Sequence, residues 1–291
     1  MKKLLSSPFF LAACAIALWS TLATLGLALK HVPPFLLTGI ALLIGSIPAW
    51  PFVRQWRVSA GVLALGIYGL FGFHFLLFIA LRHAPAVEAN LVNYLWPLLM
   101  VVLAPLFLAG AKLSKAHVAA ALIGFAGACI AILGASSGAA AGAAVAASSG
   151  FAWGYIPALG SAFIWASYSL ITMRLASSGR SFPTAAIGLF GLVSGLLSLL
   201  CHIALEPRTA LSLQDWGLMA VMGLGPLGAA FFLWDKALKL GDARQIGILS
   251  YATPVASTVL LMLATGRSLN GSIAVATAMI VGAAVLGSRA Q

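Results

Sequence analysis

The sequence predicts an all-α polytopic membrane protein whose ten transmembrane helices form two inverted repeats of five. The first observation behind this prediction is the composition: hydrophobic residues make up 62% of the 291 residues, and charged residues only 7%. A soluble domain carries about 25% charged residues, so this chain has too few charges to cover a surface in water. The second observation is a series of apolar segments long enough to cross a bilayer. Together they exclude a soluble enzyme, a disordered chain and a secreted disulfide scaffold.

The apolar segments number ten, and each is about 20 residues long, which is the length of a membrane-spanning helix. Charged residues and clusters of proline and glycine separate them. We expect spans at 9–29, 34–52, 60–82, 86–109, 115–134, 153–174, 183–205, 215–238, 243–265 and 270–288. The first span follows two lysines and is long for a signal peptide, so we expect it to be retained as the first helix.

The lysines and arginines indicate how the spans are oriented. If the N-terminus lies inside and the spans alternate, twelve of the 16 cations fall on the inner side, and only Lys30, Arg82, Arg208 and Arg267 fall outside. Cytoplasmic loops are enriched in Lys and Arg, so we expect both termini in the cytoplasm of a bacterial inner-membrane protein. The net charge of +11 does not indicate a nucleic-acid partner, because the cations are scattered and form no basic stripe.

An uncharged Ala, Gly and Ser-rich segment at 135–152 separates the fifth span from the sixth. It predicts an external linker between a first five-helix repeat at 1–134 and a second at 153–291. Because each half has an odd number of spans, the second half is inverted relative to the first. Inverted repeats are typical of secondary transporters, which bind substrate near the membrane midplane.

Sparse sequence matches relate the two halves. A shift of 157 residues aligns Arg82 with Lys239, Tyr94 with Tyr251 and Pro97 with Pro254, and a shift of 146 aligns Trp19 with Trp165.

The fourth and ninth spans each carry a stripe of small or polar residues that ends in a proline. The stripes are Asn90, Asn93, Tyr94 and Pro97 in the fourth span, and Gly247, Ser250, Tyr251 and Pro254 in the ninth. Each proline frees a backbone carbonyl one turn earlier, and matched interruptions in two halves indicate a binding region. The alternative for the prolines is a packed kink, and for the asparagines a contact that only joins helices.

Aromatic residues near span centres predict a ring-lined cavity. Trp19, Trp96 and Trp165 lie near span centres, and tyrosine and phenylalanine residues accompany them, namely Tyr68, Tyr94, Tyr168, Phe75 and Phe78. Aromatic rings pack offset or edge to face against ring-bearing ligands. For any one of these residues, packing between helices is the alternative. The other tryptophans, Trp50, Trp56, Trp153, Trp216 and Trp234, lie near span ends, where indoles favour the membrane interface.

Few ionisable residues lie within the spans. His74 is mid-span, where it either acts in the site or bonds as a neutral ring to a backbone carbonyl. Glu88 lies near the outer end of its span and either pairs with Arg82 or carries a proton. At the inner end of the eighth span, a group of charged residues that includes an Asp235–Lys239 pair predicts a solvated cytoplasmic edge.

No motif in the chain indicates catalysis, a cofactor or a metal. The three cysteines, Cys14, Cys129 and Cys201, are isolated in apolar segments, and nucleotide-binding, hydrolase and metalloprotease motifs are absent from the sequence. We therefore expect no enzyme activity, no cofactor and no metal site.

The ten spans, the inverted halves and the central Trp19 and Trp165 resemble EamA-type members of the drug/metabolite transporter superfamily, over nearly the whole chain. The segment Val92-Asn93-Tyr94-Leu95-Trp96-Pro97 is similar to the fourth-span signature of bacterial aromatic amino acid exporters. The resemblance implies an exporter of aromatic and other neutral amino acids, with Tyr94, Trp96 and Trp165 in its cavity. It also implies that His74 and Phe78 face the cavity. If such exporters favour tyrosine there, the difference allows methionine or threonine as substrates.

We thus expect an alternating-access exporter whose partners are a neutral amino acid and the lipid bilayer. Its expected substrate contacts are Trp19, His74, Phe78, Asn93, Tyr94, Trp96, Trp165, Tyr168, Ser250 and Tyr251, with hinges at Pro97 and Pro254 and with Glu88 as a proton or ion-pair group. The alternative function is proton-coupled export of lipophilic cations, which cation–π attraction would favour. Such an exporter needs a deeply buried carboxylate, and the sequence has none at a span centre.

Overall fold

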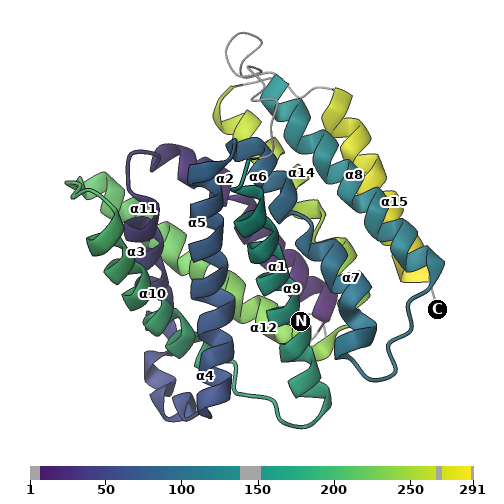
Figure 1. Ribbon diagram of the computed structural model, residues 1–291, viewed down its shortest axis with the longest axis horizontal. Helices are drawn as coiled ribbons and strands as arrows, with labels where there is room; N and C mark the ends of the chain where they lie inside the picture. Colours follow the sequence, from purple (N-terminus) through teal and green to yellow (C-terminus); the bar gives the residue numbers. More distant parts are fainter. Residues whose placement is uncertain (1–6, 138–151, 267–270, 290–291) are drawn as a thin grey trace.

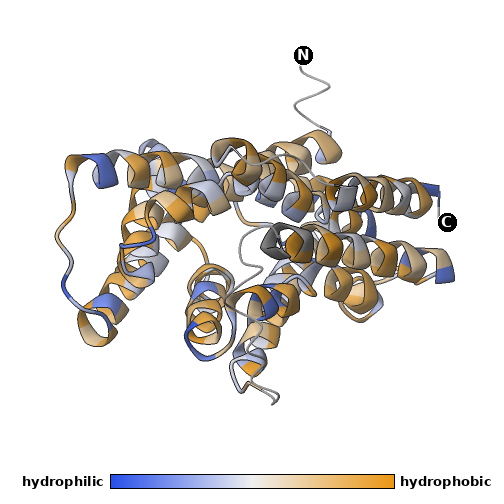
Figure 2. Ribbon diagram, turned by 90° about the horizontal axis from the view of Figure 1, so that it is seen from above, coloured by the Kyte–Doolittle hydropathy of each residue, from blue (hydrophilic) through white to orange (hydrophobic). Residues whose placement is uncertain are grey.

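The computed structural model describes residues 7–137, 152–266 and 271–289, and all regular structure within these ranges is helical (Figure 1). Within them, nine stretches of helix are long and apolar enough to cross a membrane, and Gly271–Gly287 is a shorter apolar tenth. Each stretch coincides with one predicted span to within a few residues, which confirms the predicted class. Hydrophobic residues cover most of the helices, and hydrophilic residues gather at helix ends and loops (Figure 2). Most of the predicted linker, at 138–151, lies outside the described residues.

Several spans consist of consecutive helical segments. In the first half these are α1 (Pro8–Ser20) and α2 (Leu22–Ala28); α3 (Pro34–Ser46) and a 3₁₀ helix (Ile47–Trp56); α4 (Ala60–Ile67), a π-helical turn (Tyr68–Gly72) and α5 (Phe73–His83); α6 (Ala86–Asn93) and α7 (Trp96–Phe107); and α8 (Lys115–Ser137). In the second half they are α9 (Tyr155–Ser177); α10 (Ala186–Leu205); α11 (Leu213–Leu224), a π-helical turn (Gly225–Ala229) and α12 (Ala230–Leu240); α13 (Ala243–Leu249) and α14 (Ala252–Ala264); and α15 (Gly271–Arg289).

The two π-helical turns support the repeat. One interrupts the third span at Tyr68–Gly72, and the other interrupts the eighth span at Gly225–Ala229. They are 157 residues apart, which is the shift that aligns Tyr94 with Tyr251. Because π-helical turns are rare, their occurrence at matched positions is strong evidence for related halves.

The contacts between spans of the two halves form a symmetric set. The second span packs on the seventh through α3 and α10, and the fifth packs on the tenth through α8 and α15 (Figure 1). The first span packs on the eighth through α1 and α12, as the sixth packs on the third through α9 and α5. Exchanging the halves leaves the first two contacts unchanged and converts the last two into each other, which is the pattern of a two-fold pseudosymmetry.

Glycines allow the close approach of α3 to its neighbours. A Cβ atom added at Gly45 would lie 2.7 Å from the carbonyl oxygen of Gly223 and 2.9 Å from the Cα of Gly228. A Cβ atom at Gly195 of α10 would lie 2.9 Å from the carbonyl oxygen of Gly39. Small residues let helix backbones pack directly in membranes, and here they fix the second span against the seventh and eighth.

Polar contacts between helices join groups that the charge pattern places on the same side. On the predicted outer side, Arg82 contacts Glu206 at 2.6 Å, and His31 contacts Asp215 at 3.0 Å. On the predicted inner side, Arg244 donates to the carbonyl oxygen of Lys112 at 2.7 Å. These pairs agree with the predicted alternation of spans, and "outer" and "inner" name these two sides below.

Candidate functional site

A cavity of about 480 Å³ lies between the two halves. Its deepest residues come from the middle of the spans, and its shallow residues, such as Gly26, Pro34 and Leu81, lie at the outer ends of theirs. Because its lining runs from the middle of the spans to their outer ends, the cavity opens toward the outer side. The residues around it are Trp19, Leu22, Ala23, Gly26, Pro34, Leu37, Thr38, Phe73, His74, Leu77, Phe78, Leu81, Asn90, Asn93, Tyr94, Trp96, Trp165, Met222, Leu227, Phe231, Thr253 and Ser257.

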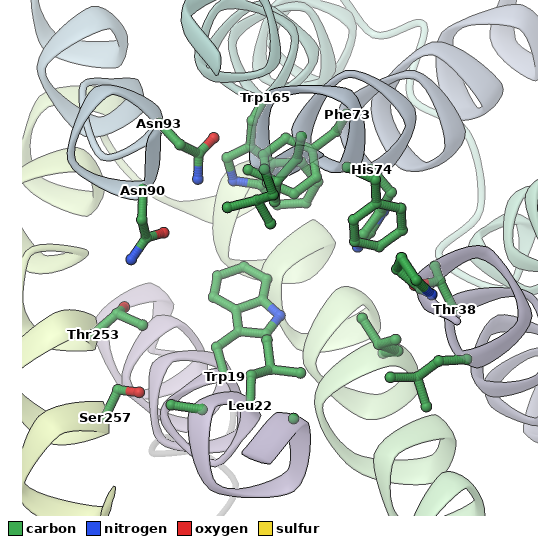
Figure 3. Close-up of a pocket in the computed structure, with 18 of the residues that line it drawn as sticks. Trp19, Leu22, Thr38, Phe73, His74, Asn90, Asn93, Trp165, Thr253 and Ser257 are labelled. Carbon is green, nitrogen blue, oxygen red and sulfur yellow. The ribbon is translucent and has the colours of Figure 1, made fainter. Parts of the chain in front are cut away.

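Tryptophans form the floor of this cavity. Trp165 and Trp19 face each other in Figure 3, with ring centroids 5.7 Å apart. The ring centroid of Trp165 also lies 6.4 Å from that of Trp96, and both pairs meet at steep interplanar angles. The Nε1 of Trp19 donates to the carbonyl oxygen of Pro226 at 3.0 Å, within the π-helical turn. Three tryptophans from three spans thus meet at the predicted centre, and the turn holds one of them in place.

Trp234 belongs to the same cluster, although its place near a span end predicted an interfacial position. Its ring centroid lies 5.0 Å from that of Trp19, and the residue is 1% exposed. Trp234 lies three residues after Phe231 and shares its inward face of α12. Its Nε1 donates to the hydroxyl of Ser169 at 3.3 Å, so the protein supplies the partner that lipid headgroups would supply at the interface. The interfacial prediction for Trp234 is wrong.

His74 lines the cavity as a neutral ring bonded to the backbone. Its Nδ1 lies 2.6 Å from the carbonyl oxygen of Leu70, which belongs to the π-helical turn. A carbonyl only accepts, so Nδ1 carries the proton, and Nε2 of the neutral ring is an acceptor. The ring packs between Phe73 and Phe78. The predicted bond to a backbone carbonyl is therefore present, and because the ring also lines the cavity, a role for His74 in the site stays a prediction.

Amide and hydroxyl groups form the opposite wall. Asn90 and Asn93 of α6 stand beside Thr253 and Ser257 of α14 (Figure 3). The hydroxyl of Ser161 donates to Oδ1 of Asn93 at 2.8 Å, which fixes the amide and leaves its nitrogen as a donor. Thr253 is 7% exposed, and its Oγ1 has no hydrogen-bond partner among the described residues. A buried hydroxyl without a partner beside a cavity indicates a place for a polar ligand group.

The ninth span contributes different residues from those predicted. Ser250 and Tyr251 are not among the residues around the cavity. The hydroxyl of Ser250 bonds back to the carbonyl oxygen of Ile246 at 2.8 Å, and the ring of Tyr251 fills the space beside Gly124 of α8. These two residues form the turn between α13 and α14, which brings Thr253 and Ser257 to the cavity instead. The sequence repeat could have indicated Thr253 as a cavity residue, because a shift of 157 residues aligns it with Trp96.

Tyr168 also lies outside the cavity, one turn below Trp165 on α9. Its ring centroid is 5.4 Å from that of Trp165, and a Cβ atom added at Gly69 would meet the Tyr168 ring at 2.4 Å. Tyr168 therefore packs beneath the tryptophan floor on the inner side.

The two predicted proline interruptions coincide with helix breaks. The fourth span breaks at Tyr94–Leu95, between α6 and α7, and the ninth breaks at Ser250–Tyr251, between α13 and α14. Pro97 and Pro254 lie in the first turn of the following helices, where a missing N–H costs no intrahelical bond. Neither proline is among the residues around the cavity.

The predicted pairing of Glu88 with Arg82 is wrong. Arg82 does not pair with Glu88, because it bonds to Glu206, which also accepts from the backbone N–H groups of Phe35 and Leu36 at the start of α3. Glu88 is exposed and accepts from the hydroxyl of Tyr155.

The predicted Asp235–Lys239 pair forms at 2.6 Å, but Asp235 is 1% exposed and is not part of a solvated edge. It faces Thr184, which precedes α10 and covers it.

No group of three His, Cys, Asp or Glu residues that could hold a metal occurs within the described part of the chain. The described residues around the cavity also include no Asp, Glu, Lys or Arg. The arrangement can thus enclose a small molecule between rings and uncharged polar groups.

The chain is similar to known transporters along nearly its whole length. The EamA-like transporter family matches residues 6–133 and 152–289. The aromatic amino acid exporter YddG of Ancylobacter novellus is 41% identical over 288 residues, which cover 97% of this chain and 96% of that protein. The protein of the same name from Escherichia coli K12 is 28% identical over 283 residues, which cover 94% and 93%. A solved crystal structure aligns with a TM-score of 0.84 at 39% identity and covers 97% of both chains.

Proposed function

The chain belongs to the EamA-like transporter family, and from this premise we propose that it exports aromatic and other neutral amino acids across the bacterial inner membrane. Relatives named aromatic amino acid exporters support the substrate class. Both termini lie in the cytoplasm in this proposal, because most cations then lie on the inner side. The cavity described above is accordingly the outward-open state of the transporter.

The observation that carries the proposal is the chemistry of the cavity lining. Aromatic rings cover the floor, amides and hydroxyls stand on one wall, and the described lining contains no Asp, Glu, Lys or Arg, while its histidine is a neutral ring bonded to the backbone. A neutral amino acid combines an apolar side chain with a zwitterion of zero net charge. A volume of about 480 Å³ is also in the usual range of small-molecule sites.

The substrate side chain rests on Trp19 and Trp165, where rings meet at offset or edge-to-face angles. Its carboxylate and ammonium groups lie at the polar wall, beside Asn93 and Thr253. Nε2 of His74, on the far side of the cavity, accepts from an indole N–H or a phenol O–H of the substrate. The remaining lining residues predicted from sequence, Phe78, Tyr94 and Trp96, enclose the ring.

Export proceeds by alternating access of the two repeats. The breaks at Tyr94–Leu95 and Ser250–Tyr251 lie within one residue of matched positions in the fourth and ninth spans, and Pro97 and Pro254 keep these breaks from closing into continuous helix. Matched breaks of this kind are common in transporters built from inverted repeats. Binding is modest in affinity, because the substrate has to leave on the outer side.

The alternative is proton-coupled export of lipophilic cations. Cation–π attraction to the tryptophans favours it, but the cation's charge would face a described lining without a carboxylate.

Flux of labelled phenylalanine, tryptophan, methionine and threonine into proteoliposomes, beside ethidium and protein-free liposomes, distinguishes the two functions. We expect saturable flux of phenylalanine and tryptophan, weaker flux of methionine and threonine, and none of the dye. Transport of ethidium without any amino acid flux would overturn the proposal in favour of the alternative.

A further inference from the structure

The repeat assigns the cavity residues of the first and third spans counterparts in the second half, most of which lie on the inner side. The shift of 146 residues that aligns Trp19 with Trp165 carries the first-span lining residues, Trp19, Leu22, Ala23 and Gly26, onto Trp165, Tyr168, Ser169 and Thr172 of α9. The shift of 157 residues that aligns the π-helical turns carries the α5 lining residues, His74, Leu77, Phe78 and Leu81, onto Phe231, Trp234, Asp235 and Leu238 of α12.

The counterpart surface is closed where the cavity is open. Trp165 and Phe231 already line the outer cavity, but the other six counterparts lie outside it and are at most 2% exposed, and α9 packs directly along α12. The corresponding helices α2 and α5 face each other across the cavity (Figure 3). If the halves exchange conformations, α9 and α12 separate as α2 and α5 are separated here, and their facing side chains become the lining of an inner cavity.

A cation marks the corresponding position at each mouth. Arg82 ends α5 and lies 5.4 Å from the ring centroid of Phe35, and its counterpart Lys239 ends α12 and lies 4.0 Å from the ring centroid of Phe182. Each cation is also in an ion pair. The side chain of Arg82 is 37% exposed at the open mouth, whereas that of Lys239 is 12% exposed at the closed mouth. Opening of the inner side therefore exposes Lys239.

At the closed inner mouth, one carboxylate oxygen of Asp235 accepts no hydrogen bond from the described residues. Its Oδ2 accepts from the hydroxyl of Thr184 and from Nζ of Lys239, each at 2.6 Å. Its Oδ1 is buried and has no hydrogen-bond partner among the described residues. Lys236, on the same helix, is exposed and turned away from this interface. Burying an ion pair is costly, and leaving one carboxylate oxygen unpaired adds to the cost, so the arrangement indicates a role outside stability.

We propose that Asp235 and Lys239 form a second amino acid site on the inner side, which binds both charged groups of the substrate once α9 and α12 separate. This site rests on the export function proposed above. The substrate ammonium group binds the Asp235 carboxylate, and the substrate carboxylate binds the Lys239 ammonium group. Two new ion pairs replace the pair between Asp235 and Lys239, so neither side chain is left as an unpaired charge.

Replacement of the Asp235–Lys239 pair by two ion pairs to the substrate selects for α-amino acids before they reach the outer cavity. An amine without a carboxylate leaves Lys239 unpaired, and an acid without an ammonium group leaves Asp235 unpaired. The outer cavity has rings, amides and hydroxyls but no described ionised group, so it holds the zwitterion only through uncharged hydrogen bonds and distinguishes substrates by their side chains. Ionic recognition of the zwitterion is thereby confined to the inner site, and side-chain recognition to the outer cavity.

Accessibility of matched cysteines tests the inner cavity. In a background with Cys14, Cys129 and Cys201 replaced by alanine, Thr172→Cys is compared with its counterpart Gly26→Cys, where an added Cβ atom meets nothing within 4 Å. A membrane-impermeant charged maleimide is applied from one side or the other. We expect Gly26→Cys to react from the outer side and Thr172→Cys from the inner side, with inner phenylalanine slowing the second reaction.

Phenylalanine flux by the same preparations separates the two proposals. A preparation that transports phenylalanine while Thr172→Cys reacts from neither side overturns the inner cavity and leaves the export function standing. A wild-type protein without flux contradicts the export function instead.

Half-saturating phenylalanine concentrations, measured separately on the inner and outer sides of the membrane, test the role of the pair formed by Asp235 and Lys239. We expect Asp235→Asn to raise the half-saturating phenylalanine concentration about tenfold on the inner side and to leave the outer value unchanged. The control, Asp242→Asn, removes another inner-side carboxylate away from the interface of α9 and α12 and should alter neither value. A structural role for Asp235 changes both sides or only the maximal rate, and either result would contradict the proposed site.

Discussion

Trp19 and Trp165 meet edge to face, with ring centroids 5.7 Å apart, although 146 residues separate them in the chain. They occupy the same position in the two repeats, so their contact lies where the repeats cross. The cavity opens above this contact, and the closed interface of α9 and α12 lies below it. The pair is therefore the floor of the outer cavity, and the same pair is the roof of any cavity that opens on the inner side.

Trp96 tests whether this floor binds substrate. Its ring centroid lies 6.4 Å from that of Trp165 and 5.8 Å from that of Trp234. We expect Trp96→Ala to lower the initial rate of phenylalanine flux by about tenfold, and Trp96→Phe to keep more of it because a ring is retained. Trp216→Ala, at an exposed tryptophan outside the cavity, is the control. Normal flux in Trp96→Ala would show that the ring serves only in packing.

Thr253 separates ligand binding from folding. Its Oγ1 is buried without a partner, so Thr253→Val removes no hydrogen bond within the described protein and nearly preserves the shape of the side chain. We expect an unchanged or slightly higher unfolding temperature together with a several-fold higher half-saturating phenylalanine concentration, because the substrate loses a hydrogen-bond partner.

The control for Thr253 is Thr277→Val on α15. The hydroxyl of Thr277 bonds to the carbonyl oxygen of Ile273, and the residue lies away from the cavity. Unchanged half-saturation in Thr253→Val would remove this hydroxyl from the site.

Gly45 tests the close packing of the second span. An alanine Cβ atom there would lie 2.7 Å from the carbonyl oxygen of Gly223, and a backbone atom cannot move away as a side chain can. We expect Gly45→Ala to destabilise the protein by about 1–3 kcal/mol, measured by thermal unfolding in detergent. Gly217→Ala, in the middle of α11 where a Cβ atom meets nothing within 4 Å, should instead stabilise by about 0.5–1 kcal/mol. Equal effects at both glycines are inconsistent with a packing role.

The fold followed from sequence because membrane spans depend on composition and length. Every predicted span coincides with a helical stretch, since about 20 apolar residues have few other stable structures in lipid. The π-helical turns at Tyr68–Gly72 and Gly225–Ala229 were not predicted, because no residue type marks them. They become apparent only as equal interruptions of two related spans.

The candidate site could be predicted from the sequence only in part, because it depends on which face of each helix meets the neighbouring helices. Asn90, Asn93 and Tyr94 of the expected stripe line the cavity, whereas Pro97 does not. On the ninth span the turn at Ser250–Tyr251 changes the face, so the stripe predicted for a continuous helix is displaced. Trp234 was assigned by its distance from a span end, but its burial is set by Trp19 and Trp165 of other spans.

Asp242 links stability to pH at the inner end of the eighth span. Partial burial acts to raise the pKa of its carboxyl group, but the hydrogen bonds and charge of Arg244 and the N-terminal N–H groups of α13 outweigh this and hold the pKa below its ordinary value. A carboxyl group whose pKa is lowered by folding stabilises the protein above its unfolded pKa, which is about 3.9, and loses that contribution as pH falls through the folded value. We expect wild type to unfold at a higher temperature than Asp242→Asn at neutral pH, with a difference that shrinks below about pH 4. Ser59→Ala removes an uncharged cap from α4, so its cost should be the same at every pH. If the difference between wild type and Asp242→Asn were equally constant, the carboxylate charge would not be what stabilises this helix.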